Sequence, residues 1–375
     1  MDHGSSATCA GRDCPPPPPP KLPPPPPEPP PPAPPAPVPP APVPPAPPAP
    51  DPKPLYRPEV GAYLANQRMA AGLLVHSLHD RLGEPQWTEQ QTFEDNDNAK
   101  RKSGWVRLVG RDASSQSRDG NFDVDSTTWL LHGGAEVAQW SVLRGDDRLH
   151  LGGMLSYGWG SSDASAQGNE FRAQGKVQGF TVGAYGTWFQ NDVDRLGWYV
   201  DLWGQYGWFD NTINGQALPS LKYNSTMLAL SAETGYAWLP SRSRDWVVEP
   251  QAQVIWLHGQ QDGVTEPNGT RVGDASGSGW IGRLGVRTHR TWIHDDGDRT
   301  QAYLTLNWWH DNVNDQIAFN GLQMRDLYPQ DRYEVKLGVD LQRGKGWTGW
   351  ANVGYEWGRQ SYQAVTGRIG VKYTW

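Results

Sequence analysis

The chain has 375 residues and a formal net charge of −7, from 33 Lys and Arg against 40 Asp and Glu. This balance argues against broad electrostatic binding of nucleic acid or acidic lipid, and the length allows one large domain or two ordinary ones. Most of the 35 prolines lie between Pro15 and Pro58, and all 20 tryptophans lie between Trp87 and Trp375. The composition therefore divides the chain into two physically different parts.

Residues 1–14 contain the only two cysteines, Cys9 and Cys14, and are expected to be an unstructured remnant. A small disulfide loop in an oxidising compartment is the alternative. Residues 1–12 lack the apolar core of a signal peptide. No apolar run approaches the roughly 18 residues of a membrane-spanning helix. We therefore expect a fragment or a truncated gene product.

Residues 15–54 form a low-complexity tract in which runs of proline are broken by Ala, Val and Glu. Proline fixes φ and lacks an N–H donor, so the tract is predicted to be an extended polyproline II leader without packed structure. At about 3.1 Å per residue it would span roughly 120 Å. A spacer is favoured over a ligand for proline-binding modules because a folded domain follows directly.

Residues 55–84 are predicted to be a linker helix, starting at Pro58 and stopping at Gly83. Small residues such as Gly61, Ala65 and Gly72 make this helix slim, and polar groups lie all round it. Such a helix suits a narrow, polar, water-lined enclosure rather than lipid or an apolar core. The residues expected to contact that enclosure are Asn66, Arg68, His76, His79, Asp80 and Arg81.

From residue 104 onward the hydrophobic period is two, which predicts β-strands. Leu304 and Val339, for example, belong to apolar sets that alternate with polar neighbours. About twelve strands are predicted, near 104–111, 126–140, 148–160, 171–190, 196–209, 221–239, 245–259, 278–291, 300–311, 332–343, 347–358 and 363–375. Residues 85–375 are thus expected to be one all-β domain.

Tryptophans gather near the ends of these strands, as at Trp198, Trp238, Trp308 and Trp357. Aromatic girdles at both ends of apolar strands are typical of a transmembrane antiparallel β-barrel. The opposite face is charged and is predicted to face the lumen, with Asp201, Glu233, Glu249, Arg283, Arg287, Glu334, Lys336, Glu356 and Arg368. A soluble sandwich would place its apolar face inside instead.

The predicted connections alternate in length, which favours a membrane barrel over a sandwich. Those near 112–125, 161–170, 210–220, 260–277 and 312–331 are long. Those near 141–147, 191–195, 240–244, 292–299 and 344–346 are short.

Several separated segments resemble the translocators of AIDA-type autotransporter adhesins. They are YRPEVGAY (56–63), HDRLGE (79–84), YVD (199–201), YGWFDN (206–211) and PQAQV (250–254). The similarity covers roughly residues 55–375 and includes the aromatic terminus. It implies a twelve-stranded outer-membrane barrel, with the helix in its pore, that moves an N-terminal passenger to the cell surface. Such passengers are commonly adhesive β-solenoids, and none is present here.

Several short motifs are interpreted as structural. GSGWIG (277–282) has dinucleotide-binding spacing, but a strand follows it where a helix is required. Arg144-Gly145-Asp146 and the acidic run 295–298 are interpreted as turns rather than integrin or calcium sites. His76 and His79 share a predicted helix face, but nothing completes a metal site around them.

Enzymatic roles are not expected. Trp309-His310-Asp311 is the nearest candidate for a catalytic constellation and is a weak one. Self-cleavage in related proteins uses an Asn-Asn step in the pore helix, whereas this chain has Asn66-Gln67. Asp201 is a weak candidate for the assisting carboxylate. A lumen residue bonded to the helix is the simpler interpretation.

The interpretation is a monomeric, non-enzymatic outer-membrane translocator without cofactor or metal. A diffusion porin and a soluble all-β binding domain are the alternatives. The expected partners are outer-membrane lipid, a covalently linked passenger, the barrel assembly machinery and periplasmic chaperones, and no nucleic acid. The last strand is predicted to carry an assembly signal on its outward set, Ile369, Val371, Tyr373 and Trp375.

Overall fold

The computed structural model describes residues 56–84, 102–143, 146–191, 196–216, 218–240, 246–273, 275–313, 316–324, 327–344 and 346–375. They belong to a compact unit that spans Lys53–Trp375. The predictions for residues 1–14 and 15–54, and the turn interpretation of Arg144-Gly145, lie outside the described residues.

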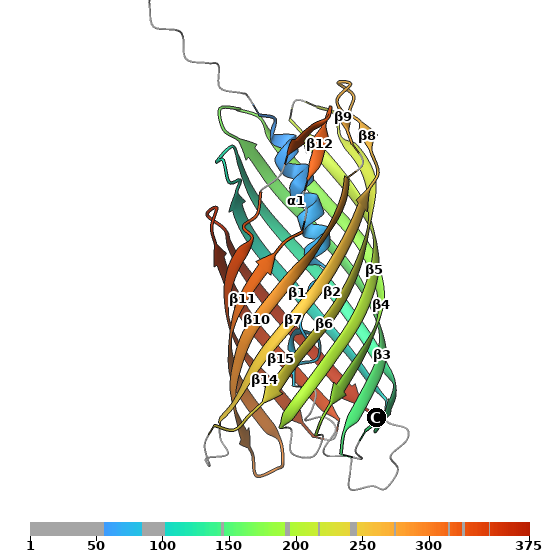
Figure 1. Cartoon of the computed structure of the whole chain (residues 1–375), viewed down its shortest axis with the longest axis vertical. Helices are drawn as coiled ribbons and strands as arrows, with labels where there is room; N and C mark the ends of the chain where they lie inside the picture. The colour runs from blue at the N-terminus through green and yellow to red at the C-terminus, as the bar shows by residue number, and fades with distance from the viewer. Residues whose placement is uncertain are drawn as a thin grey trace, which may run out of the picture. The chain divides into compact units, whose positions relative to one another are not determined.

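Within these ranges, twelve strands close into one antiparallel barrel (Figure 1). β1 pairs with both β2 and β16, so the sheet has no free edge and its backbone groups are satisfied without water. The predicted twelve-stranded β-barrel is confirmed. Its strands are β1 (Ser103–Gln116), β2 (Phe122–Trp140), β3 (Arg148–Ala166), β4 (Arg172–Phe189), β5 (Gly197–Gly215), β6 (Leu221–Ala237), β7 (Trp246–Gln261), β10 (Ala275–Ile293), β11 (Arg299–Asp311), β14 (Asp331–Arg343), β15 (Trp347–Gly358) and β16 (Gln363–Thr374).

The two faces of each strand have opposite chemistry, as the period of two predicts. On β5, Leu202 is 52% exposed, whereas its neighbour Asp201 is fully buried. The apolar set therefore faces outward and the charged set faces the lumen. None of the described helices is long and apolar enough to cross a membrane.

Outward-facing tryptophans form two belts. At one end, Trp129 pairs with Trp159 and Trp256 pairs with Trp280 across neighbouring strands. Outward tryptophans also mark the other end, where the last strand finishes. The first belt contains Trp129, Trp159, Trp208, Trp256, Trp280, Trp308 and Trp357, and the second contains Trp140, Trp188, Trp198, Trp238, Trp246, Trp292, Trp347 and Trp375. Amphipathic rings at these levels suit the two interfaces of a lipid bilayer.

The predicted alternation of loop lengths is wrong for the first three hairpins. At the end of the barrel where β1 finishes, the connections within these hairpins are short, at 117–121, 167–171 and 216–220. The connections 141–147 and 238–245, at the opposite end, are longer. The strands continue past the apolar belt because ladder hydrogen bonds need no apolar side chains. Polar residues there, such as Asp123, still pair across strands.

Two outer connections are long, and they form a sheet of their own. Residues 262–274 contain β8 (Val264–Thr265) and β9 (Arg271–Val272), and residues 312–330 contain β12 (Ile317–Phe319) and β13 (Leu322–Met324). β12 pairs with β9 across the two connections. We call this four-stranded sheet the cap sheet.

The linker is two helices, α1 (Pro58–Gly72) and α2 (Leu78–Leu82), rather than one helix up to Gly83. α1 lies in the barrel lumen and packs against β2–β5, mainly on β3 and β4 (Figure 1). The first helix ends at Gly72, a poor helix former, and Ser77 caps the second through Asp80 N at 3.2 Å. The carbonyls freed between the helices accept hydrogen bonds from Gln205 and Gln253 of the barrel.

Candidate functional site: the plugged lumen

The outer half of α1 is held by aromatic packing. Tyr63 stacks on Tyr223 of β6, with ring centroids 5.3 Å apart, and meets Phe319 of the cap sheet edge-on at 5.5 Å. Arg57, just before the helix, pairs with Glu266 between β8 and β9 at 2.7 Å. The cap sheet therefore packs on the same helix that the barrel wall supports.

Asn66 joins α1 to the barrel backbone. Its amide lies 3.1 Å from Lys176 O on β4 and 3.3 Å from Thr212 O on β5. Gly175 permits this contact, because a Cβ there would lie 2.4 Å from Asn66 Oδ1. The Asn side chain thus fixes the height of α1 in the lumen.

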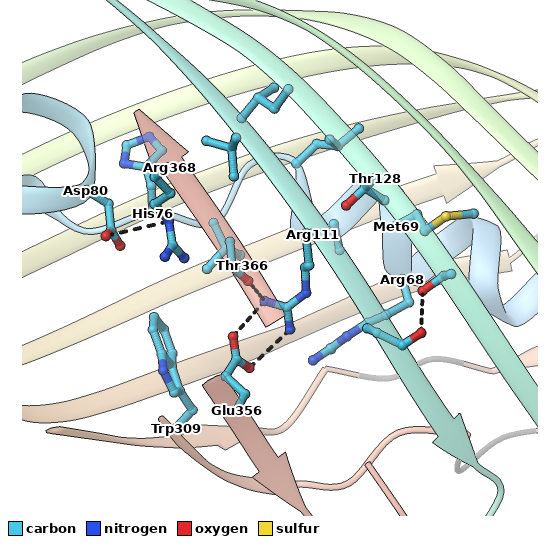
Figure 2. A pocket seen from close by; sticks show the side chains of 18 of the residues that line it. Arg68, Met69, His76, Asp80, Arg111, Thr128, Trp309, Glu356, Thr366 and Arg368 are labelled. Carbon is cyan, nitrogen blue, oxygen red and sulfur yellow. Dashed lines mark hydrogen bonds and ion pairs between the residues drawn. The ribbon is translucent and has the colours of Figure 1, made fainter. Parts of the chain in front are cut away.

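A cavity of about 110 Å³ lies on the side of the lumen that α1 does not fill (Figure 2). Arg68 crosses it to form an ion pair with Asp311 of β11. Arg111 contacts Glu356 at 2.6 Å and Thr366 at 3.0 Å on its far wall. Apolar side chains such as Leu73 and Trp309 share the lining with charged groups, and Arg111 and Arg332 both pair with Glu356 there.

The segment between the helices places His76 against Trp203, with ring centroids 4.5 Å apart. His76 is outside either helix and His79 is inside α2, so the predicted shared helix face does not exist. His79 instead bonds Glu249 of β7 at 2.8 Å. Among the described residues, no group of three or more His, Cys, Asp and Glu side chains could hold a metal ion.

α2 is tied to the barrel on several sides by buried charge pairs. Arg81 bonds Asp201 of β5 at 2.6 Å, and Asp80 bonds Lys336 of β14 at 2.7 Å. Leu78 N donates to Glu233 of β6 at 2.9 Å. These contacts run from three residues of α2 to β5, β6 and β14, so they oppose sideways movement of α2.

The remaining predicted lumen residues are also buried or nearly so. Glu233 pairs with Arg283 at 2.8 Å, and Glu356 pairs with Arg332 at 2.9 Å. Glu334 accepts a hydrogen bond from Asn307 at 2.7 Å. Arg368 lies 3.6 Å from Asp80.

Sequence reasoning missed several residues that contact the plug. Arg107 donates to Asp80 O at 2.8 Å, and Glu84, just after α2, pairs with Arg287 at 2.9 Å. Arg287 also reaches Asp340 at 2.9 Å. Arg107 and Asp340 are polar residues on the inward faces of β1 and β14, which is the signal that could have found them. Glu84 belongs to the linker itself, and its partner Arg287 is one of the predicted lumen residues.

Gly83 ends α2 for two reasons. Its φ is +66°, which favours glycine, and a Cβ there would lie 3.0 Å from Trp350. The chain can therefore turn away from the plug only with a glycine at this position.

The motifs interpreted as structural have these surroundings. GSGWIG (277–282) lies inside β10. Asp298 accepts hydrogen bonds from Gly344 N and Arg343, and both lower the pKa of its carboxyl. His310 points outward whereas Asp311 points into the lumen, so the two side chains do not converge.

The Autotransporter beta-domain family matches residues 104–354. The chain belongs to the autotransporter β-domain family. It is 34% identical over 333 residues to the uncharacterized protein YdeU of Escherichia coli K12, covering 86% of this chain and 70% of that protein. It is 25% identical to the autotransporter adhesin AIDA-I of Escherichia coli, covering 85% of this chain but only 25% of the adhesin.

Solved structures agree with this assignment. The transport unit of AIDA-I matches with a TM-score of 0.72 at 24% identity, over 85% of this chain and 99% of that unit. The β-domain of the Bordetella autotransporter BrkA matches with a TM-score of 0.57 at 26% identity, over 72% of this chain and 98% of that domain. This autotransporter barrel is an integral outer-membrane translocator.

Proposed function

We propose that this barrel supports the export of an N-terminal passenger, anchors it at the cell surface, and is then closed by residues 56–84. The path of the linker through the barrel lumen supports the proposal. α1 starts beside the cap sheet, at the same end of the barrel as Asn169, which bonds Tyr56 O at 2.9 Å. β1 starts at the other end, where Lys102 bonds Trp375. The linker thus runs through the whole lumen.

A chain that enters α1 at the cap-sheet end must come from that side of the membrane. The cap sheet is built from the two longest connections, and long connections face the outside in outer-membrane barrels. Anything N-terminal to α1 therefore lies outside the cell. The proline-rich residues 15–54 would act there as a semi-rigid spacer.

An adhesive passenger is the further proposal. The relative AIDA-I is named an autotransporter adhesin, and the match to this chain covers only 25% of the adhesin's length. The matched part is the barrel, so the passenger class is carried over by similarity alone.

The diffusion porin is less well supported, because a porin needs an open lumen. Here α1 and α2 occupy it, and ion pairs such as Arg81–Asp201 hold them. The soluble binding domain is also disfavoured, since its exposed surface would be the apolar one. The export role requires no catalytic step.

Insertion of this barrel would depend on periplasmic chaperones and the barrel assembly machinery, and its closed sheet suits a monomer. The outward set of β16 is the proposed recognition element. Trp375 at its end is 58% exposed and stacks beside Tyr373.

The test fuses a signal peptide and a small epitope-tagged reporter to the full chain. Export predicts that the reporter on intact cells is cleaved by added protease, while the barrel resists. The variant Arg81→Met/Asp80→Asn loses the ion pairs of the plug with Asp201 and Lys336, and its reporter display is compared with that of the unaltered chain. A reporter retained in the periplasm behind a correctly inserted barrel would contradict the proposal.

A further inference from the structure

The outer wall of the barrel carries two adjoining hollows on β2–β6, at the cap-sheet end. The first, of about 700 Å³, is lined by Trp129 and Trp159 and by polar and charged residues that include Lys176, Asp210 and Lys222. The second, of about 590 Å³, has the aromatic side chains of Tyr157, Phe180 and Trp208 in its lining, together with polar residues such as Ser225 and Thr226. The two share Gln178, Asp210 and Asn224, so they form one continuous surface.

The two lysines stand in one row. Thr212 of β5 is opposite Lys176 of β4 on one side and opposite Lys222 of β6 on the other. All three side chains point outward. Neighbouring strands lie about 4.8 Å apart, so the two lysine Cα atoms are about 10 Å apart. Two flexible ammonium groups at that spacing can converge on one anion.

The row lies just beyond the apolar belt. Phe180, Trp208 and Thr226 form an in-register row of their own, four residues nearer the middle of the barrel. Four strand residues span about 13 Å, and strand tilt reduces this to about 10 Å along the membrane normal. The lysines therefore reach the level of lipid headgroups, while the aromatic hollow lies at the level of the tryptophan belt, where the acyl chains begin.

The electrostatics favour an anion at this position. Lys176 and Lys222 are both exposed. Asp210 is the one carboxylate that lines the basic hollow. It lies two residues from Thr212 on β5, diagonal to both lysines, so one negative charge stands beside two positive charges. The backbone is held from inside, because Asn66 bonds the carbonyls of Lys176 and Thr212.

We propose that this surface binds a phosphorylated glycolipid of the outer leaflet, with its phosphate between Lys176 and Lys222 and an acyl chain against Phe180 and Trp208. Basic groups at the membrane surface attract anionic headgroups, and aromatic rings pack against lipid chains. The inference rests on the orientation given under the proposed function, with the cap sheet outside. It concerns the lipid-facing wall, so it is independent of the passenger.

The test uses the full chain refolded in nonionic detergent and measures the binding of bis-phosphorylated lipid A by native mass spectrometry. Dephosphorylated lipid A with the same acyl chains, and inorganic phosphate alone, are the two further probes. Lys176→Gln/Lys222→Gln should weaken binding of the phosphorylated lipid roughly 30-fold, at about fivefold per lysine. The Asp210→Asn variant should bind the phosphorylated lipid as tightly as the unaltered protein does, or more tightly.

The matched control is Lys102→Gln/Arg343→Gln, which removes two exposed positive charges at the opposite end of the barrel and should leave binding unchanged. Lys176→Arg/Lys222→Arg keeps the charge and should retain binding. Equal binding of dephosphorylated lipid A, or equal loss in the control, would overturn the proposal. So would saturation by inorganic phosphate at the same concentration, since the acyl contacts would then contribute nothing. Reporter display on cells does not measure this binding, so the two proposals fail separately.

Discussion

Arg81 of α2 contacts Asp201 of β5 at 2.6 Å, and both side chains are completely buried. The guanidinium also lies 4.2 Å from the ring centre of Tyr185 and 3.3 Å from Thr187 Oγ1. An ion pair so enclosed is costly to form and more costly to break, because removing one partner leaves the other charge buried alone. It makes the plug specific to one position in the lumen.

Arg81→Met should therefore destabilise the folded barrel by about 3–5 kcal/mol. The measurement is the temperature at which refolded protein loses its heat-modifiable band on a detergent gel. The double variant Arg81→Met/Asp201→Leu should recover much of the loss, because no buried charge is left unpaired. Arg343→Met, which breaks an exposed pair with Asp298, should change little. Equal losses in Arg81→Met and Arg343→Met would show that the buried pair is unimportant.

Removing the plug should open the pore. Deletion of residues 1–83 should raise single-channel conductance in planar bilayers, because α1 and α2 then no longer fill the lumen. Deletion of residues 1–57 is the control, since it leaves both helices in place and should keep conductance low. If the two deletions conduct alike, the linker does not close the barrel.

A charged side chain on the lipid-facing wall should destabilise the barrel. Leu304 points outward on β11 and Val339 points outward on β14. Arg at either position should destabilise the barrel by about 2–4 kcal/mol in lipid. Thr128→Glu is the lumen control, because Thr128 lines the cavity opposite Arg111 and a carboxylate there meets a positive charge. Urea unfolding in vesicles gives the free energies, and similar losses at both faces would reverse the inside and outside assignment.

The end of β16 should matter more for insertion than for stability. Lys102 and Trp375 close the barrel through backbone hydrogen bonds, at 3.2 and 3.0 Å, which side-chain changes leave intact. Tyr373→Ser/Trp375→Ser should thus slow appearance in the outer membrane of cells while the refolded protein melts nearly normally.

The control for this variant is Trp292→Ser/Trp347→Ser, which removes two belt tryptophans at the same end from other strands. Outer-membrane levels of the control should stay close to those of the unaltered protein. Normal insertion of the β16 variant would leave barrel closure as the only role of its aromatic residues.

The period of two was enough to assign the faces of the strands. Shifting the pairing register of a strand by one residue would exchange its lipid-facing and lumen-facing sides. Because the apolar residues must face lipid, each strand is left with one possible register. Leu202 and Asp201, or Leu304 and Thr305, lie on the sides that their polarity predicts. The strand boundaries were less accurate where polar strand ends such as Asp123–Ser165 extend the ladder beyond lipid.

The break in the linker was not predictable from local propensity alone. Gly72 and Ser77 allow one helix to stop and another to start, but Gln205 and Gln253 must be present to bond the freed carbonyls. Those glutamines lie more than 120 residues away in the chain. The cap sheet is similar, since β9 and β12 meet only because two connections share one rim.

The sequence by itself determined the barrel fold, the number of its strands and which residues face lipid, because each strand carries its own period of two and tryptophans mark its ends. The resemblance to AIDA-type translocators implied the class of protein. Only the tertiary structure decided which lumen charges pair. Arg81 meets Asp201 and Asp80 meets Lys336 because of the height of the plug and the stagger of the strands around it. Both are properties of the closed barrel as a whole, and no local stretch of sequence encodes them.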